Sequence, residues 1–189
     1  MSLPAKQDRF DAEAYLAWET EQTEKHQYIA GEVFAMAGAS EAHVTVAGNV
    51  FFTLRAHLRG GPCSVFISDM KLRVETDDAF FYPDVFVTCA ESDRTETRYK
   101  SAPTLTAEVL SPSTSAYDHG AKFAAYRKLP SLREYVLIDP ERLNEDLFRR
   151  DNNGRWVLYP SEAGEPVEFA SLDLCVPIET LYEDVRFDS

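Results

Sequence analysis

Apolar and polar positions along the chain predict many short strands and a few helices. Runs rich in aromatic and β-branched residues, closed by Gly, Pro, Asn or Asp, are typical of strands. They occupy residues 27–38, 63–75, 80–89, 104–111, 133–139, 146–151 and 155–160. The first of these predicts a strand pair or a single strand, segments 63–75 and 80–89 predict a hairpin around Asp77 and Asp78, and the last two predict a hairpin across "NNG".

Three segments have a helical pattern instead. Residues 8–25 are polar and amphipathic, and a second helix follows Ser40 as N-cap and stops at Gly60 and Gly61. Its apolar stripe predicts either a core face or a dimer face and comprises Val44, Ala47, Phe51, Leu54 and Leu58. The third helix covers 119–129, with Asp118 as N-cap and Pro130 as the stop.

The order of these elements predicts an α/β (α+β) fold, in which a mixed β-sheet core is flanked by helices. A helix and strands precede this core, and a hairpin closes it on the C-terminal side. The 189 residues are expected to form one domain, 1–189, with a core at about 28–160.

Charge is unevenly distributed over the chain, whose formal net charge is -13. Residues 1–40 carry 3 basic against 7 acidic side chains, 41–140 carry 11 against 13, and 141–189 carry 5 against 12. The two ends are therefore acidic extensions. This balance argues against broad, non-specific binding of nucleic acid, but the middle is nearly neutral and bound divalent cations would make it positive.

The location of the protein is inferred from what its sequence lacks. Its apolar runs are shorter than the ~20 residues of a membrane span, and the first ten residues have no apolar core of a signal peptide. Cys63, Cys89 and Cys175 are odd in number and widely spaced, which favours free thiols over a disulfide or a zinc site. We expect a cytoplasmic protein with no membrane partner.

Two acids stand inside segments that are otherwise apolar. Asp84 interrupts "FFYPDVFVTC", and Glu108 interrupts "TAEVLS". Burial of a carboxylate costs several kcal/mol unless it is paired, hydrogen-bonded or bound to a metal. Two such acids on neighbouring strands would repel each other unless one is protonated or a cation lies between them. Oxygen-rich sites of this kind suit Mg²⁺ or Mn²⁺.

Lys122 adds a cation to this picture. It shares a helical stripe with Ala125, Tyr126 and Leu129, so its amine is expected at an inward or boundary position. Taken by itself, such a lysine is more often a surface residue whose stem covers apolar area. Beside Glu108 it would hold a nucleophilic water or offset charge on a phosphate.

The segments "YPDVFV", "AEVLSPSTSAYDHGAKFAAYRKLP" and "EYVLID" resemble the bacterial Uma-two family of predicted endonucleases, within the restriction-endonuclease-like PD-(D/E)XK superfamily. The resemblance implies that Asp84 and Glu108 are metal ligands, joined by the backbone carbonyl of Val109. The usual lysine two residues after the second acid is replaced by Leu110, and Lys122 matches a lysine that substitutes for it in similar proteins. Asp84, Glu108 and Lys122 are thus the implied catalytic residues.

Further positions resemble the family less specifically. Glu32, Asp69 and Lys71 match positions near the site, although Asp69 and Lys71 also suit a solvated strand edge. A two-residue turn at Asp77 and Asp78 would place Lys71 opposite Asp84. The histidines show no metal-ligand spacing and are interpreted as partly exposed helix or turn residues: His26, His43, His57 and His119.

The function predicted from these residues is a Mg²⁺- or Mn²⁺-dependent endonuclease that acts on nucleic acid, preferably DNA, as a homodimer. Leu110 and the acidic surface motivate an alternative, a catalytically inactive module of the same fold that binds nucleic acid or assembles proteins. Hydrolysis of a small phosphorylated compound stays open as well, because the sequence shows no obvious basic track for a long polyanion.

Overall fold

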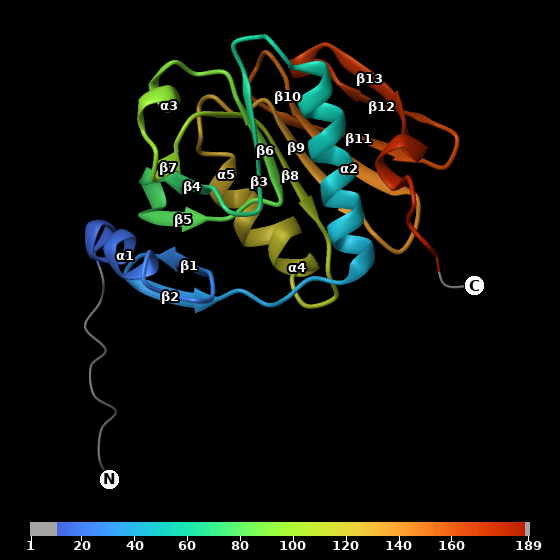
Figure 1. Ribbon diagram of the computed structural model, residues 1–189. Helices are drawn as coiled ribbons and strands as arrows, with labels where there is room; N and C mark the ends of the chain where they lie inside the picture. The colour runs from blue at the N-terminus through green and yellow to red at the C-terminus, as the bar shows by residue number, and fades with distance from the viewer. Residues whose placement is uncertain (1–10, 188–189) are drawn as a thin grey trace.

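The computed structural model describes residues 11–187, which form three sheets and the helices that cover them (Figure 1). The helical segments are α1 (Ala12–Glu19), α2 (Glu41–His57), η1 (Glu75–Asp77), α3 (Ser92–Thr95), α4 (Ser115–Tyr117), η2 (Asp118–Lys122), α5 (Phe123–Tyr126), η3 (Ala170–Leu172) and η4 (Ile178–Tyr182). The strands are β1 (His26–Ile29), β2 (Glu32–Ala35), β3 (Ser64–Ile67), β4 (Lys71–Val74), β5 (Ala79–Phe81), β6 (Val85–Thr88), β7 (Tyr99–Lys100), β8 (Pro103–Val109), β9 (Glu134–Asp139), β10 (Asn144–Arg150), β11 (Trp156–Glu162), β12 (Pro166–Phe169) and β13 (Leu174–Pro177).

The large sheet has the order β11-β10-β9-β8-β6-β3, and its β8–β9 pair is parallel while the other pairs are antiparallel. Alternate residues of its central strands point to opposite faces. Leu105, Ala107 and Val109 pack with α2 in one core, whereas Tyr135 and Leu137 pack with α5 in another. The predicted mixed sheet flanked by helices is confirmed.

The small sheet has the order β2-β1-β5-β4-β7, and it corrects one prediction. Segments 63–75 and 80–89 are not two continuous strands: each begins in one sheet and ends in the other. Ser68, with a φ of 51°, interrupts the first segment, and Pro83, which has no N–H to donate to a ladder, interrupts the second. The two crossing points lie side by side, because the Ser68 amide donates to the Asp84 carbonyl at 2.9 Å.

Helix α2 begins as predicted. The Ser40 hydroxyl accepts from the His43 amide at 3.2 Å, which caps the first turn. The buried stripe is turned slightly from the predicted one, since Val44 is 60% exposed. The α2 residues that enter the core are Val46, Ala47, Val50 and Leu54, with Phe51 and Leu58 partly buried beside them.

The third predicted helix starts earlier than expected. It runs from Ser115 through α4, the π-turn η2 and α5 to Tyr126, so Asp118 lies inside it and is not its N-cap. Asp118 instead forms an ion pair with Lys122, 3.3 Å between Oδ1 and Nζ. π-turns within helices are frequent at functional sites.

The structure modifies the predicted elements near both ends of the chain. In the described part, the first helix is shorter than residues 8–25, because α1 covers Ala12–Glu19; residues 8–10 lie outside the described residues. The hairpin across "NNG" is confirmed as β10–β11, and β12–β13 adds a second hairpin after it.

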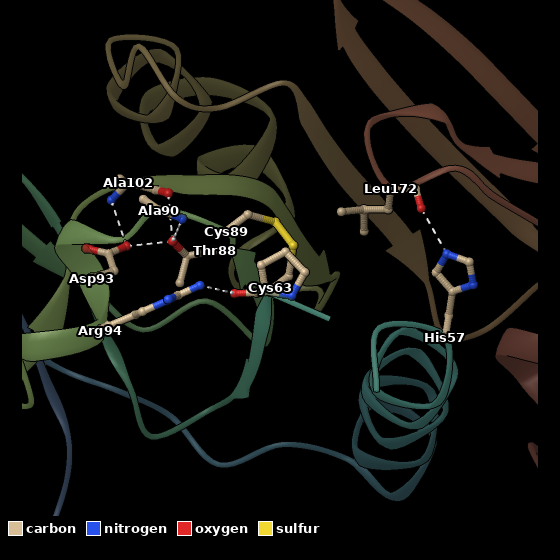
Figure 2. Close-up of a disulfide and its surroundings, with 10 residues drawn as sticks. His57, Cys63, Thr88, Cys89, Ala90, Asp93, Arg94, Ala102 and Leu172 are labelled. Atoms are coloured by element: carbon tan, nitrogen blue, oxygen red, sulfur yellow. Dashed lines mark hydrogen bonds between the residues drawn. A yellow bond between two sulfur atoms is a disulfide. The ribbon is translucent and has the colours of Figure 1, made fainter. Parts of the chain in front are cut away.

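The prediction of free thiols is wrong for two of the three cysteines. Cys63 and Cys89 form a disulfide between the start of β3 and the end of β6 (Figure 2). Cys175 is free and exposed. The β3–β6 register pairs Ser64 with Thr88, so the next residues outward face each other. Sequence spacing carries no information about such cross-strand register. The cysteines therefore no longer support a reducing compartment, and the cytoplasmic location stays a prediction.

Helices that could cross a lipid bilayer are absent from residues 11–187, where none is both long and apolar enough.

Glu145 on β10 gives a testable prediction about stability. It is fully buried, and the hydroxyl of Ser161, its partner in register, donates to the Pro166 carbonyl instead. Burial, followed by the nearby Asp146, raises the pKa of Glu145 to about 8. The folded chain then holds a proton that the unfolded chain releases above pH 4.5, so the free energy of unfolding falls as pH rises from about 4.5 to 8.

Glu145→Gln keeps the shape and removes this titration. We expect the variant to gain stability on the order of a few kcal/mol at pH 8, and little at pH 4.5. Urea unfolding at both values measures this. Equal gains at the two pH values would contradict a buried, protonated Glu145.

Candidate active site

Asp84, directly before β6, lies opposite Glu108 on β8 of the large sheet. The β6–β8 register pairs Val85 with Ala107, so the next pair outward is Asp84 with Glu108. The Asp84 amide approaches Glu108 Oε2 at 3.4 Å. The two acids that the sequence singled out, 24 positions apart, are therefore neighbours in space.

Asp84 is held on both carboxylate oxygens. Its Oδ2 accepts from the Val109 amide at 2.8 Å, and its Oδ1 lies 3.0 Å from His43 Nε2. The Asp84 side chain is 20% exposed, so this acid forms the open side of the site. Val109, the third implied ligand, thus lies directly beside Asp84.

Glu108 is buried and contacts two residues of the helix that contains the π-turn. Its Oε2 lies 2.7 Å from Lys122 Nζ, and its Oε1 accepts from the Tyr126 hydroxyl at 3.1 Å. Lys122 in turn reaches Asp118. Because Ala107 and Val109 face α2, Glu108 points to the other face of the sheet, where this helix packs.

Negative charge exceeds positive charge in this cluster. Lys122 is the ammonium between Glu108 and Asp118, and Asp84 adds a third carboxylate. Burial raises the pKa of Glu108 to about 8 even though Lys122 lowers it. Burial alone would lower the pKa of Lys122, but Glu108 and Asp118 raise it above its ordinary value. Lys122 is therefore charged, and a second cation bound beside Glu108 would favour release of the Glu108 proton to water.

A hard divalent cation fits this donor set. Groups of three or more histidine, cysteine or acidic side chains placed to bind a metal are absent from residues 11–187. Mg²⁺ does not need such a cage, because it keeps several waters and takes one or two carboxylates together with substrate phosphates. Asp84 and Glu108 supply these two carboxyl groups, and a cation between them would favour the charged form of Glu108.

The three lesser candidates lie on the small sheet or on the loop before β4, and not on the strands that carry Asp84 and Glu108. Glu32 is exposed at the first position of β2, and Asp69, 87% exposed at its side chain, pairs with Lys25 at 2.8 Å. Lys71 lies over the ring of Tyr82 and not opposite Asp84, because Leu72 pairs with Phe81. The proposed two-residue turn is wrong, since the 3-10 turn η1 spans the connection.

Sequence reasoning missed three members of the cluster. His43 was interpreted as a partly exposed histidine, yet it contacts Asp84 from the first turn of α2. No local pattern could reveal this, because the contact joins residues 41 positions apart. Asp118 and Tyr126 stand four residues on either side of Lys122, and that spacing was a usable signal.

Comparisons with known proteins agree with this architecture. Residues 12–179 match the family model Uma2, described as "Putative restriction endonuclease". Two proteins of Synechocystis sp. (strain ATCC 27184 / PCC 6803 / Kazusa) are each 35% identical: slr1290 over 95% of this chain and 94% of its own, and sll1609 over 78% and 84%. A crystal structure titled as a "putative nuclease belonging to DUF820" from Anabaena variabilis ATCC 29413 superposes with a TM-score of 0.74. It is 17% identical and covers 92% of this chain and 98% of its own. That match shows a shared fold.

Proposed function

The chain belongs to the Uma2 family of "putative restriction endonucleases", and from this premise we propose that it is a nuclease that hydrolyses phosphodiester bonds, preferably of DNA, with Mg²⁺ or Mn²⁺. The observation that carries the proposal is the convergence of Asp84, Glu108 and Lys122, with Nζ of Lys122 2.7 Å from Glu108 and Glu108 3.4 Å from the Asp84 amide.

Each side chain of the cluster has a role in this proposal. Asp84 and Glu108, with the Val109 carbonyl, would hold the ion, which when bound polarises the scissile phosphate and lowers the pKa of water. Lys122 offsets the negative charge that builds on the phosphate. His43 and Tyr126 each hold one carboxylate oxygen and so fix the orientation of the two acids.

Lys122 takes the place of the motif lysine that is absent at Leu110. A lysine on β8 two residues after Glu108 is missing, but Lys122 brings an ammonium to the same carboxylate from the neighbouring helix. The charge that the family motif places near its second acid is therefore present here. This favours a working nuclease over an inactive module of the same fold.

Cleavage of supercoiled plasmid tests the proposal. We expect nicked or linear product with Mg²⁺ or Mn²⁺, and intact plasmid with excess chelator. Calorimetric titration with Mn²⁺ in parallel should show binding. Absence of both metal binding and cleavage would support the binding or assembly module instead. Linear product that appears without accumulated nicked circles would support the predicted homodimer, because both strands are then cut together.

A further inference from the structure

Two cations project from one face of β4, each of them over an aromatic ring. Lys71 and Arg73 alternate with the buried Leu72 and Val74. Lys71 Nζ lies 5.2 Å from the ring centre of Tyr82, and Arg73 Cζ lies 5.0 Å from that of Phe80. An aromatic face attracts a cation and holds it in place without neutralising its charge.

These two cations differ from Lys25 and Arg98 in how they are paired. Lys25 is paired with Asp69, and Arg98 with Glu13 at 2.7 Å. Within residues 11–187, Lys71 and Arg73 have neither an ion pair nor a side-chain hydrogen bond.

Glu19, the acid that acts on Lys71 electrostatically, already has hydrogen-bond partners. Glu19 is buried and accepts from the Tyr82 hydroxyl at 2.8 Å and from the His26 amide at 2.8 Å. Partial burial lowers the pKa of Lys71, although Glu19 raises it. A partly buried cation without a hydrogen-bonded partner is stabilised by an anion that arrives from outside.

Lys71 lies beside a residue of the segment that leads into Asp84. The β4–β5 register places Lys71 beside Tyr82, two residues before Asp84. The preceding loop touches the same place, because the Ser68 amide donates to the Asp84 carbonyl. In Figure 1 the small sheet with β4 and β5 stands against the edge of the large sheet formed by β6 and β3. From Lys71 to Arg73 the β-strand advances roughly 7 Å. This is comparable to the distance between neighbouring phosphates along one strand of a nucleic acid.

We propose that Lys71 and Arg73 form a track that binds the phosphodiester backbone of the nucleic acid beside the scissile bond. The inference rests on the proposed function, and it names the substrate as a polyanion longer than one nucleotide. The track contacts phosphates and reads no bases, so it contributes equally to all sequences. The sequence did not predict this track, because Asp69 and Glu75 balance the charge of the two residues within the same segment. The structure shows that the two cations lie over aromatic rings instead of pairing with acids.

Salt-dependent binding of a labelled 30-base-pair duplex in chelator, where cleavage is blocked, tests the track. We expect Lys71→Met/Arg73→Met to bind at least about tenfold more weakly. The slope of log K against log salt should fall by about 0.9 for each phosphate contact removed. The charge-preserving swap Lys71→Arg/Arg73→Lys should keep the wild-type slope, which separates charge from packing.

Lys128→Met is the matched control, because this lysine is already paired with Asp77 and its loss should leave the slope unchanged. An unchanged slope in the double variant, with normal plasmid cleavage by the wild type, would overturn the track and leave the nuclease standing. A lowered slope without wild-type cleavage in Mg²⁺ would keep the track and overturn the proposed function. Failure of the wild type to bind the duplex at all would overturn the track.

Discussion

Asp84→Asn should reduce metal-dependent plasmid cleavage by at least about 100-fold while the fold is retained. Asparagine still offers an oxygen to the Val109 amide, whose hydrogen bond to Asp84 is 2.8 Å long. What the variant lacks is the negative charge on the most exposed of the clustered carboxylates. Loss of one preorganised electrostatic contact to the reacting centre costs a factor of about 10² to 10³ in many enzymes.

Two measurements separate a lost ligand from a damaged fold. Thermal unfolding of Asp84→Asn should resemble that of the wild type, whereas its calorimetric affinity for Mn²⁺ should fall with its activity. Asp69→Asn is the matched control, because Asp69 is a nearby but exposed acid paired with Lys25. Wild-type cleavage by Asp84→Asn, or equal loss in both variants, would remove Asp84 from the proposed site.

Lys122→Met should abolish cleavage and also destabilise the protein. The side chain is 6% exposed and lies between Glu108 and Asp118, which lose their shared cation. Breaking a buried ion pair by removal of one partner typically costs about 3–5 kcal/mol. Denaturant unfolding measures this loss, and the plasmid assay measures the activity.

The stability loss of Lys122→Met should depend on pH. Without the ammonium, which lowers the pKa of Glu108, this pKa rises above its already raised value of about 8. The folded variant then binds a proton at Glu108 that the unfolded chain releases above about pH 4.5, so its stability falls as pH rises from there through the folded pKa. The deficit relative to wild type is therefore expected to be smaller at pH 6 than at pH 9.

A double variant distinguishes structure from catalysis at this position. Lys122→Met/Glu108→Gln no longer buries an uncompensated Glu108 carboxylate, so part of the lost stability should return at pH 9. Cleavage should stay absent, because both the ammonium and the second carboxylate are gone. A double variant that cleaves plasmid at the wild-type rate would show that neither group takes part in the reaction.

The local chemistry of the chain determined much of what is observed. The N-cap Ser40, the apolar runs of β6, β8 and β9, and the "NNG" turn between β10 and β11 act over a few residues, so their outcome is legible in the sequence. The same holds for the two acids inside apolar strands. Their burial requires partners wherever the strands lie, and Lys122 is one such partner for Glu108.

Register and sheet crossing were decided by the tertiary structure. Cys63 is bonded to Cys89, and His43 contacts Asp84, although these residues are distant in sequence. Lys71 lies over Tyr82 because the turn between their strands is longer than predicted. For the residues in or next to strands, a one-residue change of register would send each side chain to the opposite face. The sequence by itself therefore determined which residues need partners, and only long-range packing decided which partners they have.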